Sequence, residues 1–205
     1  MRLFLTLVLS LVLCGCVSRH PTPISHAEVH KQLAQKKARP TPYTIVIDSK
    51  YQTMTVLRNQ TVDAVYTIST SKHGLGQALN SYKTPVGLHK IVEKIGNDVP
   101  PYGIFHRRQY TGVVWQPPPP RLHLKDYIVT RVLRLKGLEP GLNAGRDKQG
   151  QLVDSEKRAI YIHGTTMEWK IGKPHTKGCI HMRNKDMIDL FNRVPTGTLV
   201  MVIPH

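Results

Sequence analysis

The sequence contains few cysteines, few acidic residues and no apolar run long enough to cross a bilayer. Three cysteines among 205 residues exclude a disulfide-dense scaffold. Hydrophobic residues make up 40% of the chain and charged residues 20%, which excludes a chain that is disordered throughout. The 15 Gly and 15 Pro favour a loop-rich fold built from strands over a helical bundle. The length fits one domain with a short appendage.

The N-terminal segment predicts export. Leu3 to Leu13 form an apolar run after Arg2. This run is shorter than the roughly twenty residues needed to cross a bilayer, but it matches the hydrophobic region of a signal peptide. The following Leu13-Cys14-Gly15-Cys16 resembles a bacterial lipoprotein signal, in which a small residue precedes the cysteine that is acylated. Residues 1–15 are therefore predicted to be the signal peptide and Cys16 the lipidation site, with an ordinary secretory signal as the alternative.

Cleavage before Cys16 leaves Cys179 as the one cysteine without an assigned role. An exported protein with a single unpaired thiol needs a reason to keep it. A nucleophile is one reason, and a buried inert thiol is the other.

The remaining chain is predicted to form a tether over 16–42 and a domain over 43–205. The tether is either solvated or carries a short helix over about 26–38, after a capping box at Ser25 and Glu28. Period-two alternation predicts strands in the domain. They lie at Tyr43–Ile47, Thr53–Arg58, Ala64–Thr70, Val86–Val92, Ala159–Ile162 and Thr198–Ile203. One helix, capped by Asn184, is predicted to follow Cys179.

Residues 97–150 are predicted to be a long loop-rich insertion. They contain Pro100-Pro101 and the run Pro117–Pro120, and such prolines belong to sheet edges or extended loops. One hypothesis makes this insertion a lid that brings Tyr110, Trp115 and Arg131 to a substrate. The alternative is a surface insertion that packs on the sheet edge.

The closing segment holds the candidate chemistry. A thiol attacks carbonyls well only as thiolate, so it needs a neighbouring base. The candidate bases near Cys179 in sequence are His163, His175, Lys177 and His181. Of these, His163 ends a predicted strand, which is a rigid platform. Gly178 allows close substrate approach and lets backbone N–H groups point at an oxyanion.

These residues also carry a family resemblance. Ile160-Tyr-Ile-His163-Gly164-Thr165 followed by Thr176-Lys-Gly178-Cys179-Ile180-His181-Met182-Arg183 resembles the signature of the L,D-transpeptidase (YkuD-type) catalytic domain. Thr84-Pro85-Val86-Gly87 resembles the TP-x-G turn of that family. The resemblance covers about residues 43–203. It implies a mainly β fold, a β-sandwich with one helix after the catalytic cysteine.

The resemblance also implies roles for single residues. Cys179 would be the nucleophile and His163 the base, with the carbonyl of Gly164 or its neighbour holding the ring. The amides of Gly178 and Cys179 would form the oxyanion hole. Substrate binding would involve Thr176, Lys177, His181 and Arg183. The implied substrate is the peptidoglycan stem peptide, and no cofactor or metal is implied.

In the implied reaction the thiol attacks the L-centre carbonyl of the position-three diamino acid and releases D-alanine. An amine of another stem or of a wall-linked lipoprotein then takes the acyl group, and water would make the enzyme an L,D-carboxypeptidase. Lys177 and His181 depart from the usual His and Arg of the motif. His181 is mostly neutral at pH 7 and would hold a carboxylate less firmly than a guanidinium.

Two other readings stay open. His163, His175, Cys179 and His181 could hold zinc in a peptidase or metal-binding protein, although their spacings are loose. A catalytically silent lipoprotein that binds the cell wall is the second reading.

The charge and the signal together predict the location. The net charge of +16 points to anionic surroundings such as phospholipid headgroups, acidic wall polymers or stem peptides. Nucleic acid is not expected as a partner, because an exported lipoprotein would rarely meet it. We expect a lipid-anchored protein on the periplasmic side of the envelope, at the outer membrane in a Gram-negative cell because Val17 replaces the retention aspartate.

Overall fold

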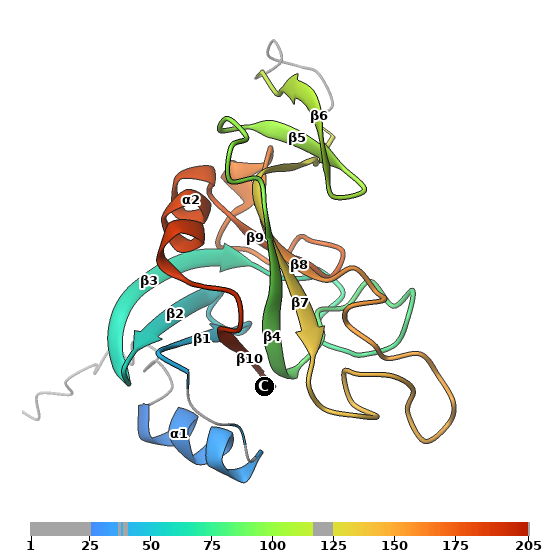
Figure 1. Cartoon of the computed structure of the whole chain (residues 1–205). Helices are drawn as coiled ribbons and strands as arrows, with labels where there is room; N and C mark the ends of the chain where they lie inside the picture. The colour runs from blue at the N-terminus through green and yellow to red at the C-terminus, as the bar shows by residue number, and fades with distance from the viewer. Residues whose placement is uncertain (1–25, 37, 39–40, 117–124, 205) are drawn as a thin grey trace, which may run out of the picture.

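The computed structural model describes residues 26–36, 38, 41–116 and 125–204. The predicted signal peptide, the lipidation of Cys16 and the proline run at 117–120 lie outside the described residues. Figure 1 shows the arrangement of the elements. They are α1 (His26–Gln35), β1 (Tyr43–Asp48), β2 (Thr53–Arg58), β3 (Thr61–Ser69), β4 (Gly87–Ile95), β5 (Gly103–His106), β6 (Gln109–Val114), β7 (Ile128–Gly137), β8 (Tyr161–Thr165), the 3-10 helix η1 (Glu168–Lys170), β9 (Ile180–Met182), α2 (Asn184–Arg193) and β10 (Leu199–Ile203).

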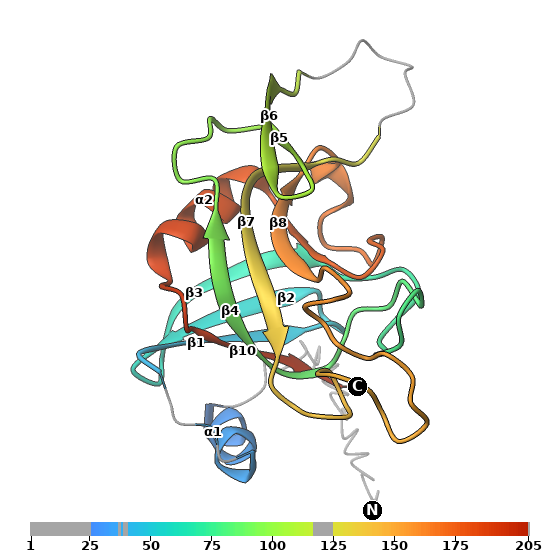
Figure 2. The same ribbon diagram turned by 45° about the vertical axis from the view of Figure 1, so that its right-hand side comes forward.

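The strands form one sheet that closes on itself. Their order is β4-β10-β1-β2-β3-β9-β8-β7-β5-β6, and β4 also pairs with β7. In Figure 2 the layer of β1, β2, β3 and β10 runs across the strands β4, β7 and β8. The predicted mainly β fold with one helix after Cys179 is confirmed.

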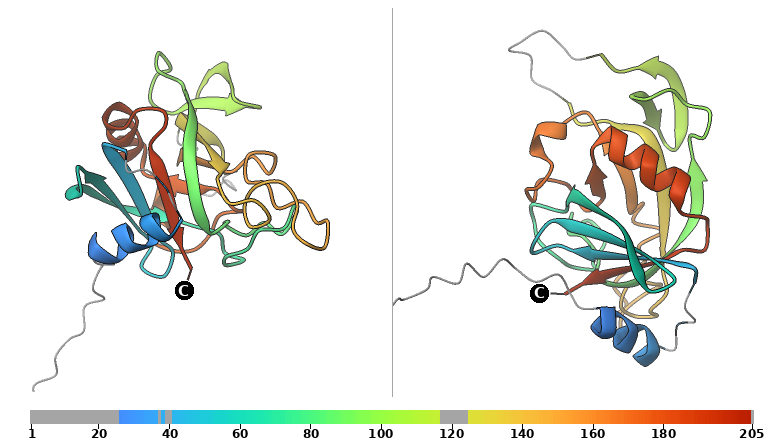
Figure 3. Two further views of the ribbon diagram at one scale, coloured as in Figure 1. Left: turned by 60° about the horizontal axis from the view of Figure 1, so that its bottom comes forward. Right: turned by 90° about the vertical axis from the view of Figure 1, so that its left-hand side faces the viewer.

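Alternation along β1 and β2 divides the buried residues between two cores. Ile45 and Ile47 face the main core, where they meet Met187 and Phe191 of α2. The intervening Val46 faces a smaller core on the other side. This smaller core is completed by Val29 and Leu33 of α1 and by Leu88, Leu199 and Met201. The two helices therefore cover opposite faces of the β1–β2–β3 layer, as Figure 3 shows.

Two details differ from the sequence prediction. The stretch 97–150 is divided by β7, a strand of the closed sheet that pairs with β4, β5 and β8. Asn184 is the first residue of α2 and not its cap, because its side chain is buried in a polar network.

The short helix predicted near 26–38 is present as α1, whose buried face packs on the domain. Among the described helices, none is long and apolar enough to cross a membrane.

Candidate active site

The sheet topology brings His163 and the Cys179 loop together. β8 and β9 are parallel neighbours, with Ile162 opposite Ile180 and His163 opposite His181. Cys179 directly precedes β9, so its thiol lies beside the strand that carries His163. The loop between the two strands thus brings Cys179 to the pocket that His163 also lines.

Both residues line one pocket of about 490 Å³. Its other lining residues are Lys72, Lys125, Asp126, Tyr127, Ile128, Met167, Lys170, His175, Thr176, Lys177 and His181. Four lysines against one aspartate make the wall electropositive. Such a pocket favours an anionic ligand.

His163 is held in one tautomer. Its Nδ1 lies 2.8 Å from the carbonyl oxygen of Gly164. Because a carbonyl only accepts, Nδ1 carries the proton and Nε2 keeps its lone pair. The side chain is buried, and desolvation lowers the pKa of His163. The ring is therefore neutral at pH 7 and able to accept a proton.

Cys179 is a protonated thiol in the resting protein. Its Sγ lies 3.5 Å from the carbonyl oxygen of Ala159, and the backbone N–H of Tyr161 also bonds the sulfur. Burial raises the pKa of Cys179 to about 11, against the opposing effects of the Tyr161 N–H and the Arg158 guanidinium. Ala159 has φ 55°, which is unusual for a residue with a side chain. The thiol therefore needs a base before it can attack a carbonyl.

The loop before Cys179 is fixed by two threonines. The Thr176 hydroxyl donates to the Cys179 carbonyl at 2.7 Å and accepts the Gly178 N–H at 3.2 Å. The Thr84 hydroxyl donates to the Gly178 carbonyl at 3.0 Å, which ties the Thr84-Pro85 turn to the nucleophile loop. Gly178 has φ 119° and passes close to the Lys83 carbonyl, so glycine is required there.

The hydrogen bonding of the Gly178 amide bears on its oxyanion role, which stays a prediction. Its N–H is already donated to Thr176, so in this conformation it is not free to bind an oxyanion. Its roles here are the close backbone approach and the turn. The predicted role of Thr176 in shaping the site agrees with its two hydrogen bonds.

Gly164 allows close packing beneath the imidazole. A Cβ there would lie 2.3 Å from Asn184 Oδ1 and 2.8 Å from the Val129 carbonyl. The Asn184 amide in turn donates to the Thr165 carbonyl at 2.9 Å and to Glu168 at 2.6 Å. Asn184 and Glu168 thus position the end of β8. The capping pattern had suggested only a helix start at Asn184.

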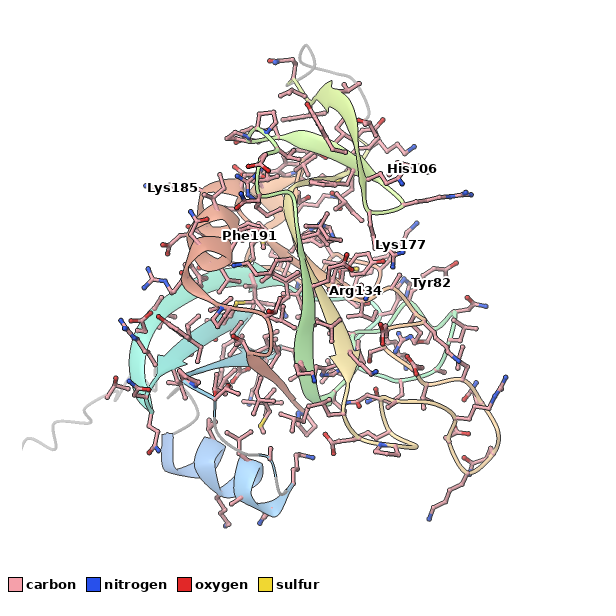
Figure 4. The ribbon with its side chains drawn as sticks, viewed as in Figure 1. Tyr82, His106, Arg134, Lys177, Lys185 and Phe191 are labelled. Carbon is pink, nitrogen blue, oxygen red and sulfur yellow. The ribbon has the colours of Figure 1, made fainter. Side chains whose placement is uncertain are left out.

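The remaining predicted substrate-binding residues separate into three environments. Lys177 is exposed at the pocket, with its Nζ 6.0 Å from the centre of the Tyr82 ring, and Figure 4 shows both residues on the side away from Lys185 of α2. His181 is buried, its ring centre lies 4.4 Å from that of His163, and burial lowers its pKa well below the usual range. Arg183 precedes α2, is exposed and does not line the pocket, so its predicted contact with substrate is not supported.

The lid residues also lie elsewhere. Arg131 is buried, donates to the Val99 carbonyl and lies over the Phe191 ring at 5.5 Å. Tyr110 packs on Phe105 and Trp115 on Tyr102, and none of the three predicted residues lines the pocket. The described part of 97–150 that does reach the pocket begins at Lys125.

The possible metal donors differ from the predicted set. Among the described residues, the donor atoms that lie within 4.8 Å of one another belong to Asp126, His175 and His181. Cys179 and His163 are not part of this group. Asp126 carries no signal in the sequence, because it is distant from the two histidines and precedes a strand that no regular pattern marks.

Comparisons with known proteins agree with the motifs. A family model for the L,D-transpeptidase catalytic domain, YkuD, matches residues 42–202. The "Putative L,D-transpeptidase YkuD" of Bacillus subtilis is 54% identical over 46 residues, which are 22% of this chain and 28% of that protein. The "Probable L,D-transpeptidase ErfK/SrfK" of Salmonella typhimurium is 46% identical over 46 residues, 22% of this chain and 15% of that protein. The matches thus span less than a third of these curated relatives. A solved L,D-transpeptidase from Mycobacterium smegmatis has a TM-score of 0.46 and 17% identity, and the match covers 80% of this chain and 59% of that one.

Proposed function

This chain belongs to the L,D-transpeptidase (YkuD) catalytic domain family, and we propose that it is a cysteine acyltransferase that acts on peptidoglycan stem peptides. The observation that carries the proposal is that Cys179 and His163 line the same electropositive pocket, the first directly before β9 and the second on the neighbouring strand β8. The thiol is protonated, and the imidazole is neutral with an unprotonated Nε2.

In the proposed first step His163 Nε2 takes the proton of Cys179 Sγ. The sulfur then attacks the carbonyl carbon at the L-centre of the position-three diamino acid. The oxyanion accepts a hydrogen bond from the backbone N–H of Cys179, since the N–H of Gly178 donates to the Thr176 hydroxyl. The C–N bond to D-alanine breaks, His163 returns its proton to the leaving amine, and a thioester remains.

In the second step the amine of an acceptor attacks the thioester carbonyl, so that a new C–N bond forms and the C–S bond to Cys179 breaks. Neutral His163 takes a proton from the attacking amine and gives it to the departing thiolate, which restores the resting thiol. The acceptor is a second stem peptide or a wall-linked lipoprotein. Lysines 72, 125, 170 and 177 favour the carboxylates of a stem peptide in this pocket.

The place of action belongs to the same proposal. The apolar run before Cys16 supports export and lipid attachment at the envelope, on the periplasmic side. The α1 helix, ten residues after Cys16, would then dock the tether on the domain through Val29 and Leu33.

A reactive acyl donor tests the chemistry without a choice of acceptor. Purified protein is incubated with imipenem, and the intact mass is followed for wild type, Cys179→Ala and His163→Gln. We expect one adduct on the wild type, none on Cys179→Ala, and acylation slowed about 10²–10⁴-fold in His163→Gln. An adduct of equal rate on Cys179→Ala, or none on the wild type, contradicts the proposal.

A further inference from the structure

One wall of the cysteine pocket carries three metal-donor groups that the acyl transfer does not use. Asp126 lies just before β7, His175 lies in the loop after η1, and His181 lies on β9. His181 Nδ1 is 3.3 Å from His175 Nε2 and 3.5 Å from Asp126 Oδ2, and the last two atoms are 3.9 Å apart. Asp126 thus joins two histidines that lie about fifty residues further along the chain and six residues from each other.

These separations fit a small divalent ion. A point equidistant from three atoms at 3.3, 3.5 and 3.9 Å lies about 2.1 Å from each, which matches Zn–N and Zn–O bonds. Two imidazoles and a carboxylate are ligands that suit Zn²⁺ and related transition metals better than Ca²⁺ or Mg²⁺. That equidistant point lies in the plane of the three atoms, so small side-chain shifts would let the ion move out of the plane and keep a fourth, tetrahedral position open to the pocket.

The ring of His175 is oriented as a ligand. Its Nδ1 lies 3.3 Å from the carbonyl oxygen of Lys173, which can only accept, so the lone pair is on Nε2. A backbone carbonyl that accepts the other ring N–H fixes the tautomer of many metal-bound histidines. The side chains of His175 and His181 are only 10% and 7% exposed, so burial holds both rings in place.

Hydrogen bonding alone accounts for part of this cluster. The Nδ1–H of His181 can donate to His175 Nε2 or to Asp126. Metal binding would move that proton to Nε2 of His181, because the ligand atom must carry a free lone pair. The hydrogen-bonded cluster and the metal-bound cluster differ in whether an ion is present, so a binding measurement distinguishes them.

We propose that Asp126, His175 and His181 form a site for a divalent transition-metal ion of the Zn²⁺ class. Neither Cys179 nor His163 is a ligand. The open position of the ion faces the pocket and takes water or an anionic group. The site is an addition to the proposed acyl transfer and does not depend on it.

The test is Zn²⁺ titration of the purified full chain, after chelator dialysis, by isothermal calorimetry. We expect Asp126→Asn and His175→Gln to lose one bound ion or weaken its binding at least tenfold. Cys179→Ala should bind as the wild type does, and so should His73→Gln, a control at an exposed histidine. Circular dichroism and thermal unfolding in chelator verify that each variant is folded.

Co²⁺ substitution identifies the ligand atoms independently. We expect an absorption spectrum without a thiolate-to-metal charge-transfer band. Loss of binding in Cys179→Ala, or appearance of that band, overturns the proposal in favour of a cysteine ligand. Unchanged binding in both Asp126→Asn and His175→Gln overturns it as well. An inactive Cys179→Ala protein that still binds zinc separates this site from the acyl-transfer function.

Discussion

The ionisation of Cys179 gives a prediction whose size follows from the site. The thiol lines the pocket and is partly buried, and burial raises its pKa to about 11, whereas a free cysteine has a pKa of about 8.5. Only the thiolate is alkylated, so below pH 8 Cys179 should react about 300-fold more slowly with iodoacetamide than free cysteine does. The rate constant of Cys179 should also rise about tenfold per pH unit between pH 7 and pH 10. The rate constant of free cysteine should instead level off above its pKa of about 8.5.

Peptide mass spectrometry measures this rate at the right residue. Trypsin cleaves after Lys177 and Arg183, so the peptide 178–183 contains Cys179 and no other cysteine. The shape of the pH profile is the informative quantity, because limited access lowers the rate equally at every pH.

The variant His163→Ala distinguishes the two possible resting states. A neutral His163 is no counter-ion, so its removal should leave the alkylation profile nearly unchanged while acyl transfer is lost. This reasoning would be refuted if the alkylation rate of the wild type levelled off below pH 9 and that of His163→Ala levelled off at a higher pH. That result would mean that the resting site is a thiolate–imidazolium pair.

Three further predictions concern stability around the site. Burial lowers the pKa of His89 to about 4, below the usual 6.5 of the unfolded chain, so the unfolded state binds the proton first. The free energy of unfolding should therefore fall by about 3 kcal/mol between pH 7 and pH 4 on account of this group; urea titrations should show a shallower loss for His89→Gln, and equal losses would exclude the effect. Gly164→Ala should lower the free energy of unfolding by about 1–3 kcal/mol, because the new Cβ clashes with Asn184 Oδ1. It should also lower kcat, because the Gly164 carbonyl accepts the hydrogen bond that orients the His163 ring. An unchanged Tm with full turnover would contradict this packing. Thr84→Val should cost about 1–3 kcal/mol in urea unfolding by leaving the Gly178 carbonyl without its donor, while Thr84→Ser retains stability; a serine variant as weak as the valine variant would point to packing instead.

The sequence predicted the strands, and the shared location of His163 and Cys179, where local patterns are strong. β2 begins and ends at the predicted residues, and β1, β4 and β10 lie within a few residues of theirs. The pair His163 and Cys179 was predictable because a strand end and a Gly-Cys loop each leave a local signal. The tautomer of His163 followed only from the fold, since it depends on where the Gly164 carbonyl points.

Other parts of the site depend on contacts that no local pattern encodes. β9 has three residues, too few for a visible alternation, yet its pairing with β8 places the Cys179 loop beside the strand that carries His163. The oxyanion role of Gly178 stays a prediction, and in this conformation the Thr176 hydroxyl, two residues away, accepts its N–H. Asp126 joins His175 and His181 only after β7 enters the closed sheet. Arg131 points to Phe191 of α2 for the same topological reason.

The central claim is that Cys179 transfers the acyl group of a stem peptide. The most direct measurement incubates purified wild type and Cys179→Ala with diaminopimelate-containing tetrapeptide muropeptides and follows the products by mass spectrometry. The account predicts loss of D-alanine with the wild type alone, together with a cross-linked product when a stem amine accepts, or a tripeptide when water does. The same loss with Cys179→Ala, or no loss with folded wild type, would contradict it.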